Sequence, residues 1–325
     1  MTNKVLFSSI CNGEIYSNYA LVCLRSFKDL ISEPVTWELC VSEEWEDRLR
    51  NKLEHLNNGN LNLIYTRLGS VEDEVDVNKY ITLGWTPYKS ADYFMWRIKH
   101  LDDLKAEGKY DTVITIDLDA IFIRNPMIIV NKFIESGLTY GGTREAFDPV
   151  VSWKQIHDKV LKYEEGFPLK TYFNLGFGLL NLNRLPTNMW ELYKQMSKDK
   201  EDWFNTQDQS FFSYIIDDSE KCVLDDAQIV AHCLWKKEFR VNRNPCLIHF
   251  SPCSADMFNQ LNTTHLGPYH LLKLKYYPIF VNLIEKESSY IPDSYIKNAK
   301  ANLRFVQSAL RLQSFLKEMF KFYKI

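Results

Sequence analysis

Two aspartates at the end of an apolar run are the residues of this chain best suited to chemistry. Segment 112–116 is rich in β-branched side chains and leads directly into Asp117-Leu118-Asp119. Such a run predicts a buried strand. Because two carboxylates are costly inside a strand, we place them at its C-terminal end, where open α/β sheets bind ligands. Two carboxylates this close suit Mg²⁺ or Mn²⁺. The competing interpretation is that they only cap the following turn.

The elements that must position this pair alternate along the chain. We expect strands at 4–8, 35–41, 61–65, 112–116 and 172–182, and helices at 17–30, 43–56, 91–104, 190–196 and 206–216. A β-α-β-α-β order predicts a mostly parallel sheet with helices on both faces. The first βα turn lacks the glycine fingerprint of dinucleotide-binding domains, which disfavours that class. We expect one α/β domain at 1–290, followed by a tail at 291–325.

Composition narrows the classes of protein. The 325 residues are 46% hydrophobic and 25% charged, which is typical of a globular chain, and the net charge of −3 argues against nucleic acid as a partner. The seven cysteines are scattered and include no CxxC pair, which favours reduced thiols and a cytoplasmic protein. We expect no signal peptide and no membrane-spanning helix, because neither apolar pattern is present.

Two motifs in the same order resemble a known family. Asp117-Leu118-Asp119 after a strand resembles the Asp-x-Asp motif of GT-A-fold glycosyltransferases. The segment FNLGFGLLNL at 173–182 resembles the FNAGVLLINL segment of glycosyltransferase family 8, which includes bacterial lipopolysaccharide galactosyl- and glucosyltransferases and glycogenin. The resemblance extends to about residue 215. It implies a GT-A fold, a UDP-hexose donor, a glycan or lipid-linked glycan acceptor and a divalent metal, usually Mn²⁺, with Mg²⁺ as the alternative.

The resemblance also implies a set of metal ligands. Asp117 and Asp119 are two of them, and a histidine near the C-terminal end of the fold is the third. His249 ends a short apolar run, but Ser251-Pro252-Cys253 follows it where the family has Gly and then Lys-Pro-Trp. We therefore take His249 as the first candidate and keep His232 and His265 as alternatives.

Donor-binding residues are implied at four places. The turn after the first strand should meet the nucleotide, with Tyr16 stacked on uracil and Tyr19 packed in the core. Arg97, on the helix before the metal strand, should pair with the diphosphate or with a sugar-binding carboxylate. Asn174 offers a donor and an acceptor to sugar hydroxyls, and glycine nearby permits close approach of the backbone. The expected donor-binding residues are Ser9, Tyr16, Arg97, Asp117, Leu118, Asn174 and Gly176.

Asp208-Gln209 resembles the Asp-Gln of the family motif DQDILN. This alignment implies a carboxylate and an amide near the anomeric carbon, and a shift of one residue would use Gln207 and Asp208 instead. Family 8 enzymes retain anomeric configuration. The acceptor hydroxyl would then attack on the leaving-group face, the diphosphate would accept its proton, and Gln209 would support the transition state from the opposite face.

The tail combines basic charge with an apolar stripe. Between 295 and 325 there are seven Lys or Arg residues and one acid, Glu318. A helical stripe is formed by Phe305, Ala309, Leu312, Leu316, Met319 and Tyr323. This pattern predicts an interfacial helix on an anionic membrane, so we expect peripheral association with the cytoplasmic face. A helix packed on the acidic body of the protein, or a short coiled coil, is the alternative, and the sequence leaves oligomerisation open.

Two other functions compete with glycosyl transfer. A phosphatase with Asp117 as nucleophile would need a Gly-Thr after the second aspartate, where this chain has Ala120-Ile121. A non-catalytic membrane scaffold would not need Asp117, Asp119, Asn174 and Asp208 together.

Overall fold

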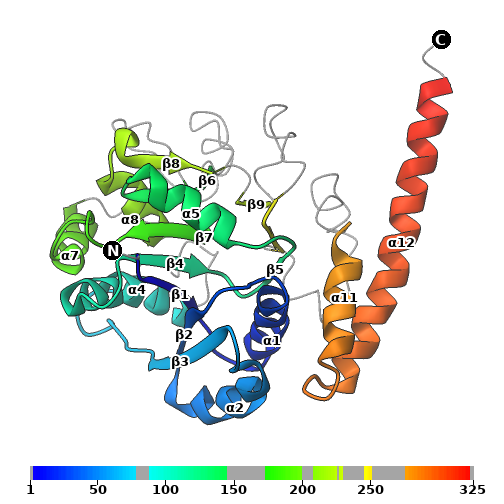
Figure 1. The fold of residues 1–325 in the computed structure, drawn as a ribbon, viewed down its shortest axis with the longest axis horizontal. Coiled ribbons are helices and arrows are strands. Elements are labelled where there is room, and N and C mark those ends of the chain that lie inside the picture. Colours follow the sequence, from blue (N-terminus) through cyan, green and yellow to red (C-terminus); the bar gives the residue numbers. More distant parts are fainter. Residues whose placement is uncertain are drawn as a thin grey trace.

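The computed structural model of the chain describes residues 3–77, 88–144, 173–199, 208–224, 227–229, 245–250 and 275–322. It has a central sheet with helices on both faces (Figure 1). Seven strands lie in the order β3-β2-β1-β4-β7-β6-β8. Their bounds are β1 Val5–Ile10, β2 Val35–Val41, β3 Leu61–Arg67, β4 Thr112–Ile116, β6 Tyr140–Arg144, β7 Phe173–Asn181 and β8 Lys221–Val223.

Parallel pairing dominates this sheet. β1 pairs in parallel with β2 and β4, β2 with β3, and β6 with β8. β7 runs antiparallel to both of its neighbours, β4 and β6. The expected mostly parallel α/β sheet is confirmed, and the strand expected before Asp117 is β4.

Alternation of side chains along the strands produces two cores, one on each face of the sheet. One core joins Trp37 and Phe177 to α1 (Glu14–Lys28), α2 (Glu43–Leu53) and α5 (Met127–Ser136). The other joins Val113 and Phe173 to α4 (Tyr88–Glu107), α7 (Met189–Asp199) and α8 (Asp208–Ile215). Since successive residues of a strand point to opposite faces, a buried sheet needs apolar residues at nearly every position.

A second sheet of three short strands adjoins the end of β4. It has the order β5-β10-β9, with β5 at Ala120–Phe122, β10 at Leu247–His249 and β9 at Gln228–Ile229. β10 is antiparallel to β5 and parallel to β9. Because β5 begins one residue after Asp119, this sheet is attached directly to the aspartate pair.

The observed helices differ from the predicted ones at their ends. The first begins at Glu14, because Gly13, with φ of +89°, turns the chain between β1 and α1. The helix predicted at 91–104 extends to Glu107, where Gly108 ends it with φ of +61°. The helix predicted at 43–56 ends as α2 at Leu53, and a 3-10 turn at Glu54–Leu56 completes it; a second 3-10 turn lies at Asp218–Glu220.

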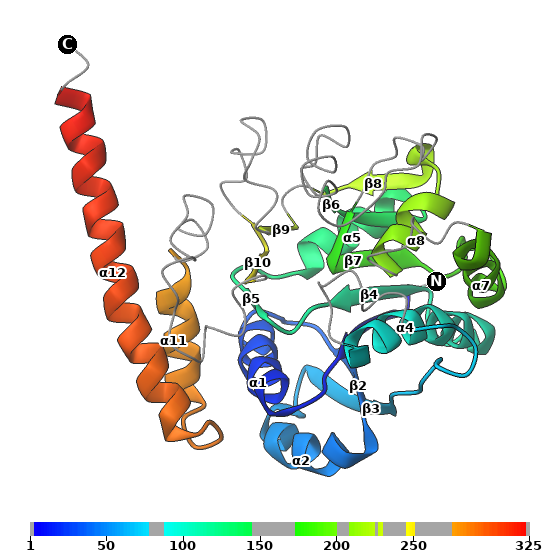
Figure 2. The ribbon, with the colours of Figure 1, turned by 180° about the vertical axis from the view of Figure 1, so that it is seen from behind.

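Two helices beyond residue 275 form a hairpin beside α1. They are α11 (Tyr277–Lys286), which the sequence analysis did not predict, and α12 (Asp293–Phe322). Glu287, at the end of α11, is buried against Arg25 of α1 and His55. Ala299 and Val306 of α12 are also buried. In both views the C-terminal half of α12 runs past the end of α11, with no described helix or strand beside it (Figures 1 and 2).

Within the described part of the chain, no helix combines the length and the apolar character needed to cross a bilayer.

Candidate active site

Asp117, Asp119 and His249 meet at the C-terminal end of β4. One ligand atom from each side chain lies within 4.8 Å of the other two. The His249 Nε2 atom is 3.1 Å from an Asp119 carboxylate oxygen and 3.5 Å from an Asp117 oxygen. His249 and Asp119 are buried, whereas Asp117 is partly exposed. The cluster is therefore enclosed on one side and open to solvent at Asp117.

Strand pairing explains how residues so distant in sequence meet. Asp117 follows β4, and its N–H donates to the Gly176 carbonyl of β7. β10 pairs with β5 so that His249 stands opposite Ala120, the neighbour of Asp119. The Phe250 N–H then donates to the Asp119 carbonyl at 2.9 Å. Both sheets thus determine the position of the cluster.

Gly176 gives the histidine its space. A Cβ atom at this position would stand 2.5 Å from Nδ1 of His249 and 2.8 Å from Oδ1 of Asn174. Asn174 accepts a hydrogen bond from the Gly176 N–H, and the Gln228 side-chain amide donates to the Asn174 Oδ1 atom at 3.0 Å. The sequence analysis missed Gln228, because the residues around it carry no motif.

Arg97 joins α4 to two carboxylates. Its guanidinium donates to Asp208 at 2.9 Å and lies 4.0 Å from Asp117. Burial raises the pKa of Asp208 to about 6; the Arg97 charge opposes this rise, and the Asp117 charge adds to it. Arg97 is itself buried, so its guanidinium is a fixed positive charge between Asp117 of the cluster and Asp208 of α8.

Gln209 also faces β7. Its Oε1 atom accepts a hydrogen bond from the Leu175 N–H at 3.1 Å, and its own N–H donates to Asp208. The sequence analysis placed Asp208 and Gln209 near the reacting carbon. In the structure they lie between Arg97 and the strand that carries Asn174 and Gly176.

Tyr16 lies on the side of α1 that faces the aspartates. Its side chain is 45% exposed; partial burial raises its pKa to about 12, and the charges of Asp119 and Asp117 contribute. Tyr19 is 1% exposed, which confirms the expectation of a core residue.

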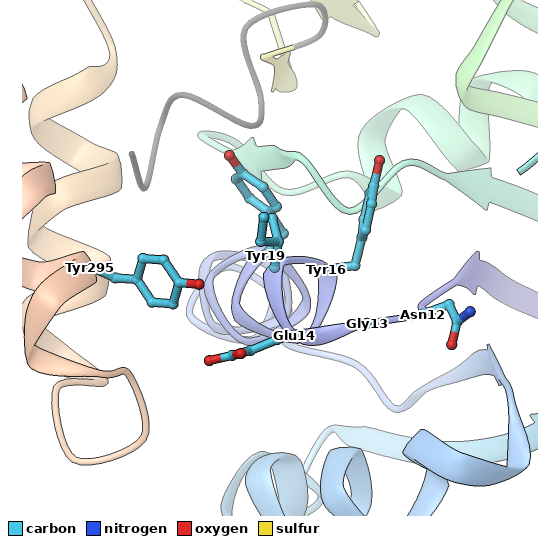
Figure 3. Close-up of a pocket in the computed structure, with 7 residues that line it drawn as sticks. Asn12, Gly13, Glu14, Tyr16, Tyr19 and Tyr295 are labelled. Atoms are coloured by element: carbon cyan, nitrogen blue, oxygen red, sulfur yellow. The ribbon is translucent and has the colours of Figure 1, made fainter. Parts of the chain in front are cut away.

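A pocket of about 500 Å³ adjoins Tyr16 (Figure 3). It is lined by Asn12, Gly13, Glu14, Ile15, Tyr16, Tyr19 and Tyr295. Tyr295, the contribution of α12, points toward α1 in this view. Burial and the Glu14 charge raise the pKa of Tyr295. Asn12 donates to the Tyr93 hydroxyl of α4 and accepts from Ser42, so the turn that forms the pocket is anchored on two sides.

Two expected donor-binding residues turn their side chains into the core. Ser9 accepts a hydrogen bond from the Trp37 indole, and Leu118 is 2% exposed. Any contact of Ser9 or Leu118 with a sugar donor would therefore be made by their main-chain groups. The alternatives His232, His265 and Gln207 lie outside the described residues.

The cluster suits a divalent cation. Two carboxylates and one imidazole form a mixed oxygen and nitrogen donor set, which Mn²⁺ accepts readily and Mg²⁺ accepts through its oxygens. The buried Asp119 and His249 would supply fixed ligands, and the partly exposed Asp117 keeps the cluster open to solvent.

Comparisons with known proteins identify the fold. No family model and no curated protein sequence matches this chain. The structure is similar to mouse xyloside xylosyltransferase 1, at 16% identity over 78% of this chain and 99% of that chain, with a TM-score of 0.53. It is also similar to galactosyltransferase LgtC in complex with donor and acceptor sugar analogues, at 14% identity over 90% of this chain and 99% of that chain, with a TM-score of 0.54.

A third solved structure agrees with these two. The bifunctional glycosyltransferase WbbM is 11% identical over 87% of this chain and 50% of that chain, with a TM-score of 0.53. These likenesses show that the chain has the fold of the GT-A glycosyltransferases, as predicted from the sequence.

Proposed function

We propose that this protein is a metal-dependent glycosyltransferase that moves a hexose from a UDP-sugar to a glycan or glycolipid acceptor with retention of configuration. The observation that carries the proposal is the meeting of Asp117, Asp119 and His249 at the carboxyl end of β4 in a GT-A fold. A bound Mn²⁺ or Mg²⁺ would neutralise charge on the leaving diphosphate. The proposed site is completed by residues of α1, α4, β7 and α8.

The protein's own residues would orient the donor. The buried Arg97 guanidinium, fixed by Asp208, supplies positive charge beside the aspartates. The side-chain amide of Asn174 would meet sugar hydroxyls, and Gln209 of α8 lies beside it, with its Oε1 atom accepting from the Leu175 N–H of the same strand. With retention, the acceptor hydroxyl attacks on the diphosphate side and gives its proton to the diphosphate, so no separate strong base is needed.

The pocket beside Tyr16 is the proposed site of the uracil base. Stacking on the exposed ring of Tyr16 would hold the base near the cluster. Tyr16 is close enough to both aspartates for their charges to raise its pKa. Tyr295 lines the same pocket from α12. Residues of the predicted 291–325 tail would therefore also contribute to donor binding.

The tail is the proposed contact with an anionic membrane surface. Phe305 is 39% and Leu312 58% exposed on α12, on the stripe predicted from the sequence. Ala309 is partly buried, the side chains of Leu316 and Met319 and all of Tyr323 lie outside the described residues, and Lys and Arg residues are interspersed. A lipid-linked acceptor at the surface of a membrane would explain a basic, partly apolar helix beside the site.

A single pair of variants tests the function. Asp119→Ala removes one of the proposed ligands, so metal-dependent hydrolysis of UDP-glucose or UDP-galactose should fall by at least about 10²-fold, the typical effect of losing a strong electrostatic stabiliser. Asp111→Asn is the matched control, because Asp111 precedes the other end of β4 and bonds Lys4 and Asn183. Activity that persists in Asp119→Ala with excess EDTA would refute the proposal.

A further inference from the structure

A further buried carboxylate lies in the interior of the sheet, away from the aspartate cluster. Glu38 of β2 is 2% exposed. It accepts hydrogen bonds from Ser8 of β1 at 2.8 Å and from Thr66 of β3 at 2.6 Å, and both of its oxygens lie 3.0 Å from Nε2 of His100 on α4. One side chain therefore connects three adjacent strands to the helix above them.

This arrangement has an energetic cost that calls for a reason. A charge taken out of water is stabilising only when its partners are well placed, and packed apolar residues often do as well. Burial raises the pKa of Glu38, but the hydrogen bonds from His100, Thr66 and Ser8 and the His100 charge outweigh it, so the pKa lies below its ordinary value. The carboxylate is thus held in its charged form by a complete set of partners.

The helix that receives this contact is the one that carries Arg97. His100 follows Arg97 by three residues, which puts the two side chains on neighbouring positions of one helix side, about 4.5 Å apart along the axis. The His100 ring also stacks on Trp96, with centroids 4.7 Å apart and planes at 9°. The contact with Glu38 thus fixes both the rotation and the height of α4 over the sheet within one turn of Arg97.

We propose that Glu38 and His100 are positioning residues, which fix α4 on the sheet and thereby hold the Arg97 guanidinium between Asp208 and Asp117. The inference rests on the proposed function. Its basis is the continuous path from Glu38 to His100 at 3.0 Å, along one helical turn to Arg97, and on to Asp208 at 2.9 Å. A guanidinium on a long side chain needs such an anchor, because a displacement of about 1 Å can cost roughly 10²-fold in rate.

A metal site is the other chemistry that this cluster suggests. Glu38, Cys40 and His100 place three ligand-type atoms within 4.8 Å. However, both Glu38 oxygens already accept hydrogen bonds from protein groups, and burial raises the pKa of the Cys40 thiol well above its ordinary value. The thiolate that a metal would need is therefore disfavoured, and a hydrogen-bonded pair of Glu38 and His100 is the better description.

The chain contains a matched control. His55 contacts the buried Glu287 with Nε2 at 2.6 Å and stacks on Tyr290 with centroids 4.0 Å apart. Like His100, His55 pairs with a buried carboxylate and stacks on an aromatic ring. It connects α11 to the body of the protein, however, and does not contact α4. His100→Leu and His55→Leu should both lower Tm, because each leaves a buried carboxylate short of a donor.

Activity should separate the two variants. His100→Leu should lower kcat/KM for donor hydrolysis by up to about 10²-fold, and His100→Gln, which keeps a donor, should recover most of it. His55→Leu should keep kcat/KM near that of the wild type. If His100→Leu does not fold, the isosteric Glu38→Gln replaces it, and unchanged kcat/KM in the folded variant overturns the inference.

A double-variant cycle tests the path through Arg97. In an Arg97→Lys background, the loss caused by His100→Leu should be several-fold smaller than in the wild type, because the guanidinium that it positions is already gone. An equal loss in both backgrounds means that His100 does not act through Arg97. That result overturns this inference and leaves the proposed function standing. A wild-type protein that neither binds UDP nor hydrolyses a UDP-hexose refutes the proposed function first, and this inference with it.

Discussion

Gly176 lies directly against the imidazole of His249. A Cβ atom at residue 176 would stand 2.5 Å from Nδ1 and 2.6 Å from Cε1 of the ring, closer than packed atoms approach. The glycine is therefore needed by a side chain from another sheet, in addition to any close approach of a ligand.

Gly176→Ala should displace His249 from Asp119 and weaken Mn²⁺ binding by roughly 10-fold, the lower end of the effect of disturbing a ligand's support. The measurement is Mn²⁺ affinity by calorimetry. Gly178→Ala is the control on the same strand: its Cβ would clash with Leu175 and Thr115 and not with the cluster. Gly178→Ala should have a lower Tm than the wild type but an unchanged Mn²⁺ affinity. Equal Mn²⁺ affinity in the two variants would contradict this account.

Removal of an aromatic ring from the α1 pocket should weaken UDP binding. Tyr16→Ala should cost roughly 1–3 kcal/mol, the scale of base–aromatic stacking. Tyr295→Ala should cost less, about 0.5–1.5 kcal/mol, since it removes one ring contact. Tyr290→Ala, on the turn between α11 and α12 and outside the pocket, is the control. An unchanged UDP Kd in Tyr16→Ala, with a lowered Tm, would make Tyr16 a structural residue.

Asp208 should set the acid side of the pH–rate profile. Its pKa is raised to about 6, so below that pH it is mostly protonated and cannot pair with Arg97 as a charge. Donor hydrolysis should therefore rise as the pH increases through about 6. Asp208→Asn should be slower and should lack this rise. An identical acid limb in Asp208→Asn would assign it to another group.

The C-terminal half of α12 should bind anionic vesicles. A chain ending at Arg311 keeps the buried residues Ala299 and Val306 and Tyr295 of the pocket, so it should fold and hydrolyse donor. It loses Lys317, Lys321 and Lys324, each worth about 1 kcal/mol near an anionic surface.

Co-sedimentation with anionic and neutral liposomes compares this truncated chain with the full chain. Binding by the full chain should weaken with salt, since the Debye length is about 8 Å at physiological ionic strength. It should not vanish, because the apolar contribution of Leu312 is insensitive to charge screening. Equal pelleting of the two chains would rule out the membrane role.

Local patterns were sufficient to predict the first half of the sheet. The run at 112–116 is a fully buried strand, and the strand predicted at 35–41 has the observed bounds of β2. The spacing of apolar residues and the length of the apolar run identify such strands, because a strand buried on both faces needs a continuous apolar run.

The rest depended on contacts that a single sequence does not encode locally. β5, β9 and β10 are two or three residues long, and only their pairing places His249 beside Asp119. Ser9 and Leu118 stay predicted donor-binding positions, and the sequence alone did not show that their side chains are buried. Glu38 gave no signal, since a lone glutamate in a strand looks like an exposed one until its partners are known.

The pairing of β5 with β10 also has a consequence for the order in which parts of the protein fold. When both aspartates have been synthesised the histidine has not, because β10 follows β5 only after several further strands and helices of the fold have been made. Loop closure of this kind is slow and entropically costly, so the cluster should be completed late in folding. Tight metal affinity would then report that β10 has paired with β5.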